Sequence, residues 1–309
     1  MSRARSLFIA LAPTTALLLA DCKPDFGSSD SLVASPRILA VRVDPPEAVP
    51  GTQASYTALV ATPGATLDAA AERADVVWRF CTAPTPVGEN NVVSTACLDP
   101  ASLVPAGGGL TILAATPKDA CSRFGPDTPP GGFRPRDPDA TGGYYQPLRL
   151  DLAGAGIAFA LARVTCNLTA ASADTASAFA AAYTPNANPH LLPIVATVGD
   201  RAIPLDALPA GARVNFEASW AGADAETYAY FDATSQSLAT KRESIRVAWF
   251  ATAGSFDSES TGRAEDDLTT TSDNAWVAPS NSGAVRMWVV LRDGRGGVDF
   301  AAYELAVIR

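Results

Sequence analysis

The sequence is short of the side chains that most enzymes use for acid–base chemistry at neutral pH. Histidine occurs once, as His190, between Pro189 and Leu191. A Ser-His-Asp or Cys-His site needs a histidine as its base. Two carboxylates across a cleft would be enough for a glycosidase, but no pair of acidic residues stands out by its spacing. We therefore predict that the protein is not an enzyme and has no catalytic residues.

Further shortages exclude other classes of protein. Only three of the 23 basic residues are lysines, and the net charge is −9. A negative field repels phosphate, so no nucleic-acid partner is expected. Beyond the N-terminal segment no stretch approaches 18 consecutive apolar residues, so no further membrane-spanning helix is predicted. No Cys-x-x-Cys pair is present, and neither a zinc site nor another cofactor is expected.

The N-terminal 22 residues have the pattern of an export signal. Arg3 and Arg5 precede an almost unbroken run of apolar and small residues that is too short for a comfortable membrane span. The run ends in Leu-Leu-Leu-Ala-Asp-Cys, which resembles a bacterial lipobox. It departs from that family at Asp21, where the pattern has a small residue. The resemblance implies a signal peptide over residues 1–21 and a lipid such as palmitate on Cys22.

An exported lipoprotein would reach the membrane through that lipid. Residues 22–35 are mostly polar and contain Gly27, Ser28, Ser29 and Ser31, so they are predicted to form a flexible tether. The expected location is the cell envelope, at the outer membrane or the cell surface. The expected partner is an envelope protein or a glycan of unknown identity.

The cysteines fit an oxidising compartment. If Cys22 carries the lipid, an even number remains, and two disulfides are the natural interpretation. Three pairings are possible, and short loops favour Cys81 with Cys97 and Cys121 with Cys166.

Alternating apolar residues predict strands through the first half of the chain. The clearest are residues 38–43, 55–60 and 75–81, followed by 110–115, 148–152 and 156–166. Trp78 lies on the inward face of the third strand and is predicted to be buried. Residues 82–143 are rich in glycine and proline, so we predict a long, largely irregular insertion there.

A helix is predicted over residues 172–183, where the chain passes between its two halves. Ser172 can cap it, Asp174 lies in its first turn, and Phe179 and Tyr183 are four residues apart. The prolines and asparagines that follow end it.

The second half shows a clearer pattern. Strands are predicted over residues 191–198, 214–220 and 245–250, then 276–279, 285–292 and 298–308. Residues 221–240 are predicted to form a polar excursion, and Asp293–Gly297 a hairpin turn. The apolar residues of the last strand change parity in its middle, which predicts a bulge near Ala301 and Ala302.

The two halves repeat one pattern: a turn, a strand, and a next strand with a buried tryptophan. Together with the segments around Trp249, Trp276 and Asp293–Gly297, this resembles bacterial immunoglobulin-like domains of cell-surface proteins. The resemblance implies a mainly β fold of two immunoglobulin-like antiparallel sandwiches, over residues 36–185 and 186–309, with one short helix at the joint.

Two loop regions offer an alternative function. Loops 82–143 and 221–240 are candidates for binding carbohydrate or calcium, because the second holds Tyr228, Tyr230 and Phe231. The acidic run Glu265-Asp266-Asp267 supplies oxygen ligands but lacks the spacing of a calcium loop. The preferred hypothesis remains a non-catalytic envelope lipoprotein that acts as a binding or structural module.

Overall fold

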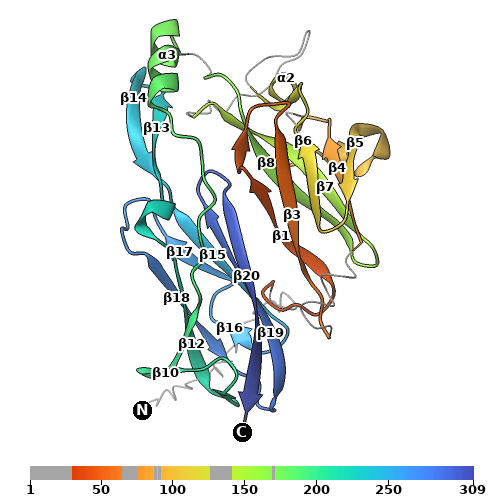
Figure 1. Cartoon of the computed structure of the whole chain (residues 1–309), viewed down its shortest axis with the longest axis vertical. Helices are drawn as coiled ribbons and strands as arrows, with labels where there is room; N and C mark the ends of the chain where they lie inside the picture. Colours follow the sequence, from red (N-terminus) through yellow and green to blue (C-terminus); the bar gives the residue numbers. More distant parts are fainter. Residues whose placement is uncertain (1–29, 65–74, 87–88, 90–91, 126–140, 169–170) are drawn as a thin grey trace, which may run out of the picture.

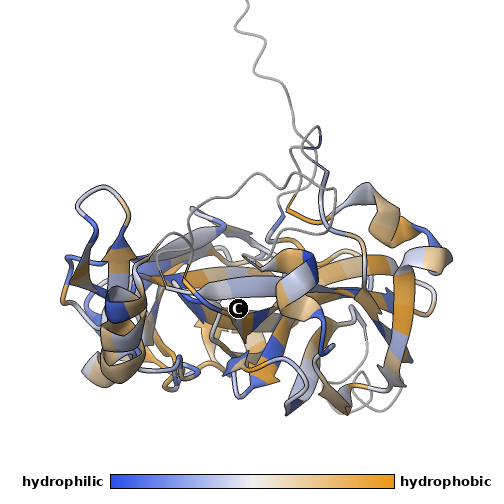
Figure 2. Ribbon diagram, turned by 90° about the horizontal axis from the view of Figure 1, so that it is seen from above, coloured by the Kyte–Doolittle hydropathy of each residue, from blue (hydrophilic) through white to orange (hydrophobic). Residues whose placement is uncertain are grey.

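The computed structural model describes residues 30–64, 75–86, 89, 92–125, 141–168 and 171–309. Within these residues the chain is mainly β and forms two sandwiches that lie side by side (Figure 1). Figure 2 shows hydrophobic and hydrophilic residues alternating along the strands, the pattern of sheets with one face toward a core.

The first sandwich packs a three-stranded sheet against a five-stranded sheet. The three-stranded sheet has the order β1 (Arg37–Asp44), β3 (Gln53–Ala61), β6 (Thr111–Ala115). The other has the order β2 (Glu47–Ala48), β8 (Gly156–Thr165), β7 (Gly143–Leu152), β4 (Val76–Cys81), β5 (Leu103–Gly108). Their inner faces bury a core that contains Tyr56, Trp78 and Leu150.

The second sandwich packs two five-stranded sheets. One has the order β10 (Arg201–Ile203), β9 (Val195–Val198), β12 (Arg213–Ser219), β18 (Thr271–Val277), β16 (Ser255–Phe256). The other has the order β11 (Leu208–Pro209), β20 (Val298–Ile308), β19 (Gly283–Asp293), β15 (Ile245–Ala251), β17 (Ser260–Arg263). Phe216, Trp249 and Trp276 fill the core between them.

The two sandwiches share a strand order. In each, a two-residue strand (β2 or β11) pairs in parallel with the last strand of the sandwich, and the remaining order of that sheet corresponds strand for strand. Trp78 in β4 and Trp249 in β15 occupy equivalent strands, and both are fully buried. A tryptophan in this strand, between two antiparallel sheets, is a mark of the immunoglobulin fold. The predicted fold class is therefore confirmed.

Helical segments are short and lie at the ends of strands. In the described residues they are η1 (Thr95–Leu98), η2 (Pro100–Ser102), α2 (Ala120–Phe124), α3 (Ala173–Ala182) and η3 (Gly222–Asp224). The predicted helix is α3, and Ser172 caps it by accepting the N–H of Thr175 at 3.1 Å. No helix in the described segments has the length and apolar content needed to cross a membrane.

The region predicted as a polar excursion, 221–240, contains most of a hairpin. Strands β13 (Thr227–Asp232) and β14 (Ser237–Arg242) pair with each other and pack against α3. Phe231 is buried, whereas Tyr228 and Tyr230 are half-buried. The hairpin was not predicted because its many polar residues conceal the alternation of β13, in which Ala229 and Phe231 are buried and their neighbours are not.

The predicted insertion also contains part of the sandwich itself. Residues 103–108 and 111–115 form β5 and β6, although the first of these holds Pro105 and two glycines. Pro105 sits at a register shift on an edge strand, where a missing N–H is tolerated. The strand predicted at 276–279 is longer than expected, because β18 begins at Thr271.

A third apolar cluster lies between the sandwiches. The outer face of β1 and β3 supplies Ala40, Leu59 and Ala61, and the outer face of β19 and β20 supplies Trp288, Val290 and Val298. Trp288 is only 1% exposed. The two sandwiches therefore meet through a packed interface.

This interface explains why the predicted bulge in the last strand is wrong. β20 pairs with β19 in unbroken register through Ala301 and Ala302. Val298 and Phe300 pack into the interface, while Leu305 and Val307 pack into the core of the second sandwich. The apolar parity changes because successive halves of one regular strand bury opposite faces.

The N-terminal end of the described chain is fixed. Ser31 and Val33 are buried, and Val33 N–H donates to the Ala251 carbonyl at 2.8 Å. Residues 1–29 lie outside the described residues, so the predicted signal peptide and most of the predicted tether do too. Of the tether predicted over residues 22–35, the part from Asp30 to Val33 is therefore held against the second sandwich.

Candidate functional site

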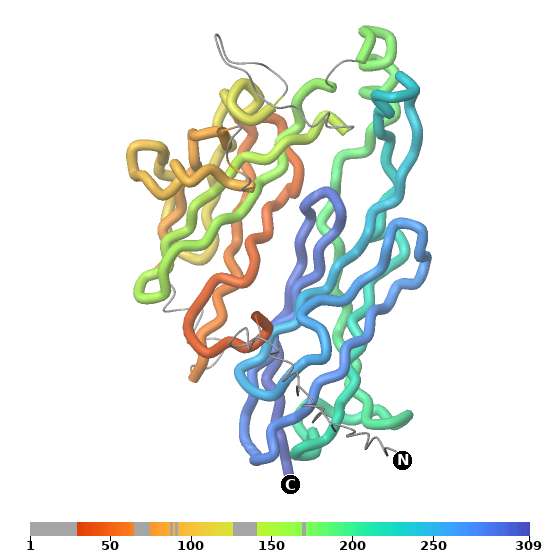
Figure 3. Tube along the Cα trace, turned by 180° about the vertical axis from the view of Figure 1, so that it is seen from behind, coloured from red at the N-terminus to blue at the C-terminus, as the bar shows by residue number. Residues whose placement is uncertain are grey.

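A network of buried charges lies at the junction of the sandwiches, above the apolar interface. In Figure 3 the β19–β20 hairpin lies between β1 and the linker that follows α3. The turn of that hairpin carries Arg295, whose side chain is 2% exposed. Arg295 lies in the hairpin turn predicted over Asp293–Gly297, but no feature of the sequence indicates that its side chain is buried.

On the side of the first sandwich the network is centred on Glu47 and Arg163. Arg163 Nε lies 3.3 Å from Glu47 Oε1, an ion pair whose geometry falls short of a hydrogen bond. Thr165 Oγ1 donates to the same carboxylate at 3.0 Å, as does the backbone N–H of Asn186. Burial lowers the pKa of Arg163, but Glu47, Tyr183 and Tyr145 together outweigh burial and leave it above the ordinary value.

On the side of the second sandwich the network is centred on Arg295. Its Nε donates to Glu243 Oε1 at 2.6 Å and its Nη2 to Glu226 Oε2 at 2.7 Å. Its Nη1 donates to the Thr184 carbonyl at 2.8 Å. The guanidinium also lies 4.4 Å from the ring centroid of Tyr228. All three nitrogens are thus used, as a desolvated guanidinium requires.

Tyr183 joins the two halves of the network. Its hydroxyl donates to Glu47, 2.8 Å from Oε2, and accepts from Arg295 Nη1 at 3.2 Å and Arg163 Nη2 at 3.4 Å. Burial raises the pKa of Tyr183, so the hydroxyl keeps its proton. One side chain thereby connects the centres of both sandwiches.

Two further acids of the network resist ionisation. Burial, followed by the nearby charge of Asp293, raises the pKa of Glu243 to about 7. Burial also raises the pKa of Asp293, although its carboxylate accepts the N–H groups of Arg295 and Gly297, each at 2.8 Å. The main physical cause is the same for both acids: burial disfavours the charged carboxylate.

The linker after α3 is held by both sandwiches. Asn188 donates to the Val43 carbonyl at 2.8 Å and accepts the Val298 N–H at 2.9 Å. Asp299 of β20 accepts from Arg42 of β1, 2.8 Å away, and from the Leu191 N–H. The arrangement can therefore fix the angle between the sandwiches. Its acids are engaged by arginines and backbone N–H groups.

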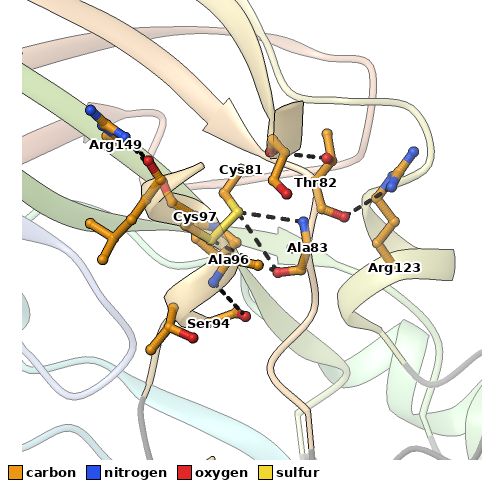
Figure 4. Close-up of a disulfide and its surroundings, with 12 residues drawn as sticks. Cys81, Thr82, Ala83, Ser94, Ala96, Cys97, Arg123 and Arg149 are labelled. Carbon is orange, nitrogen blue, oxygen red and sulfur yellow. Dashed lines mark hydrogen bonds between the residues drawn. A yellow bond between two sulfur atoms is a disulfide. The ribbon is translucent and has the colours of Figure 1, made fainter. Parts of the chain in front are cut away.

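The cysteines predicted to form disulfides are joined in pairs. Cys81 is bonded to Cys97, and Cys121 to Cys166, the pairing that the short-loop argument favours. Figure 4 shows the first bond beside Ala83, with Arg149 nearby. Arg149 Nη1 donates to the Leu98 carbonyl at 2.7 Å, which ties the disulfide loop to β7.

The other residues considered from sequence lie elsewhere. Cys22, the predicted lipidation site, is outside the described residues. The His190 side chain is 72% exposed and lies 3.1 Å from Asp224. Glu265 pairs with Lys241 at 2.8 Å, and Asp267 accepts the Thr269 N–H at 2.9 Å. Among the residues that the structure describes, no three His, Cys, Asp or Glu side chains are grouped to hold a metal ion.

Comparisons with known proteins give structural likenesses only. No protein-family model matches the chain, and no curated protein matches it. The chain is similar to the D0-D1 domain of Intimin, with 12% identity, a TM-score of 0.24, and coverage of 88% of this chain and 99% of that one. It is similar to the adhesin InvE of Yersinia pseudotuberculosis, with 10% identity, a TM-score of 0.25, and coverage of 89% and 59%.

A third likeness is to the solution NMR structure of a lipoprotein from Bacteroides thetaiotaomicron. Identity is 12%, the TM-score is 0.21, and 37% of this chain and 79% of that chain are covered. At these TM-scores the likenesses carry no argument about function. The immunoglobulin-like assignment rests on the strand order and the buried tryptophans described above.

Proposed function

We propose that this protein is a non-catalytic lipoprotein of the cell envelope, anchored through a lipid on Cys22, that presents two immunoglobulin-like sandwiches as one rigid binding or structural module. The observation that carries the proposal is the junction. Buried ion pairs from both sandwiches converge on Tyr183, and an apolar interface around Trp288 lies beside them.

A rigid junction is more useful to a binding module than to a passive spacer. Interfaces between domains of one chain are usually polar enough to allow relative motion. Here Trp288 is fully buried between the sandwiches, and Arg42 and Asp299 pair across them at 2.8 Å. The relative orientation of the two sandwiches is therefore fixed, and so is the shape of any binding surface to which both contribute.

The anchor is supported by the lipobox-like sequence that ends at Cys22 and by the disulfides, which suit an oxidising compartment. The test is incorporation of radiolabelled palmitate into the full chain, with Cys22→Ala as the variant and Ser29→Ala as the matched control. Label in the control and not in Cys22→Ala supports the anchor. Equal label in both, or in neither, overturns it.

Carbohydrate or calcium binding is the alternative that a second test addresses. A glycan array and thermal melts with calcium or with a chelator are run on the same preparation. Specific binding of a glycan would identify the protein as a carbohydrate-binding protein. A shift of the melting temperature by several degrees with calcium would identify it as a calcium-binding protein.

A further inference from the structure

Within the described residues, most of β8 has no hydrogen-bonded strand on its outer side. β2 is its outer neighbour, and it pairs only with Arg163 and Val164. On the inner side, the Cys166 N–H donates to the Gly142 carbonyl at 2.6 Å, in line with the β7–β8 pairing. Because backbone groups alternate in direction along a strand, even-numbered residues face β7. The odd-numbered ones face outward: Ile157, Phe159 and Leu161.

Residues 156–162 of this outward edge lack the features that usually keep an edge strand from pairing with another chain. Within the described part of the chain, no backbone hydrogen bond is formed by Ile157, Phe159 or Leu161 on that side. Residues 156–162 contain neither a charge nor a proline. Edge strands are usually guarded by charged residues, proline or a bulge. The opposite edge of the same sheet, β5, has both Pro105 and a register shift.

A groove of about 420 Å³ runs along this edge. It is bounded by Ile38–Val41 of β1, Ala158–Leu161 of β8, and the start of the β19–β20 turn. Its volume lies in the range of pockets that bind specific ligands. Phe159, a residue that is 40% exposed, and Leu161 give the wall of β8 an apolar surface.

The second sandwich forms one end of the groove, and Arg292 of β19 lies at that end. Its Nη2 donates to the Leu39 carbonyl at 3.1 Å, and it forms no ion pair with any described residue. Its cross-strand neighbour is Arg246, and burial together with that second cation lowers the pKa of Arg292. A carboxylate that binds beside a half-buried cation without a counter-charge stabilises that cation.

We propose that the groove beside β8 binds an extended peptide segment of a partner protein, which adds a strand to the free edge and places a carboxylate at Arg292. The inference rests on the proposed function and names the class of partner for that binding module. The unpaired N–H and C=O groups favour a peptide, because they match the repeat of a second strand. A sugar ring has no such repeat.

The probe is a displayed library of heptapeptides that alternate valine or threonine with varied residues. It is panned on the full oxidised chain, and the selected peptides are resynthesised with glutamate and with glutamine at each acidic position. We expect selected sequences to contain one acidic residue at a fixed position. Replacement of that residue by glutamine should weaken binding about tenfold, the scale of one charge-assisted hydrogen bond.

Two variants separate the two parts of the site. Arg292→Gln should abolish the preference for glutamate over glutamine, whereas Arg246→Gln, on the neighbouring strand and outside the groove, should keep it. Phe159→Pro removes an outward N–H and should weaken every peptide. Thermal melts confirm that each variant is folded. In the unaltered chain, a bound peptide should slow amide hydrogen exchange at Phe159.

The remaining outcomes overturn the inference. Failure to select any peptide, or binding unaffected by Arg292→Gln and Phe159→Pro, excludes this groove as a peptide site. A dimer that Phe159→Pro disperses, without peptide binding, would assign the edge to a second copy of the chain. Glycan binding without peptide binding would leave the envelope module standing and remove only this inference.

Discussion

Arg295 Nε donates to Glu243 Oε1 at 2.6 Å, and neither side chain is more than 2% exposed. The two residues belong to the second sandwich, yet the same guanidinium also reaches Tyr183 and Thr184 in the linker. The pair therefore stabilises the junction as well as the sandwich in which it lies.

Arg295→Met should reduce the free energy of unfolding by about 3–5 kcal/mol, because it leaves the buried Glu243 and the half-buried Glu226 without their counter-charge. Urea unfolding followed by fluorescence measures the change. Arg213→Met is the matched control, since Arg213 pairs with Asp257 at the exposed surface, where loss of an ion pair should change the stability far less. Equal losses in both variants would contradict the structural account of the network.

The stability of the protein should fall as the pH rises from about 4.5 to about 7. The raised pKa of Glu243, about 7 against an ordinary value of 4.5, means that the folded state holds a proton that the unfolded chain releases within this window. The free energy of unfolding then decreases with pH by an amount on the order of 3 kcal/mol. Asp293, with its pKa also raised, acts in the same direction.

The variant that tests this pH dependence is Glu243→Gln, which keeps an oxygen acceptor for Arg295 but cannot titrate. Melting temperatures measured from pH 5 to pH 8 should decline less steeply for Glu243→Gln than for the unaltered chain. Parallel curves would show that Glu243 does not titrate in this range.

Gly143→Ala should disturb the junction from the first sandwich. A Cβ at this position would overlap the guanidinium of Arg163 and displace it from Glu47. We expect a loss of about 1–3 kcal/mol from overpacking, with a further loss from the broken ion pair. Gly283→Ala serves as the control, because a Cβ there meets no atom within 4 Å. A neutral Gly143→Ala would show that Arg163 has room to move.

The two disulfides should contribute unequally. The chain-entropy model gives about 3 kcal/mol for the bond that closes 16 residues and about 4 kcal/mol for the bond that closes 45 residues. Double alanine variants at Cys81 and Cys97, and at Cys121 and Cys166, test this order by chemical unfolding. Peptide mapping under non-reducing conditions tests the pairing itself, and free thiols at any of the four positions would contradict it.

Strand positions could be predicted from sequence wherever one face is buried. β4 and β15 alternate cleanly around Trp78 and Trp249, so periodicity identified both strands and their buried tryptophans. The same reasoning gave a wrong prediction for the last strand. Val298 is buried in the interface between the sandwiches, whereas Leu305, on the opposite face, is buried in the core of the second sandwich. Periodicity records that a residue is buried but not which surface buries it.

The candidate sites were harder to predict, since both depend on contacts between distant segments. Glu47 and Arg163 are separated by more than a hundred residues, and each looks like a surface charge in its own stretch. One usable signal exists: Arg163 interrupts an apolar run in β8, where an unpaired charge would be costly. No signal in the sequence indicates the groove. The outer edge of β8 is left unpaired only because β2 is too short to cover it.

The attachment of Val33 to Ala251 determines how mechanical force would enter the protein. Although residues 30–35 precede the first sandwich in sequence, they are bonded to the end of β15 in the second. This is the end at which β20 finishes, opposite the β19–β20 turn. Tension from an anchored N-terminus would therefore be taken up by the second sandwich before it reaches β1. The first sandwich, with both disulfides, would be shielded from that pull.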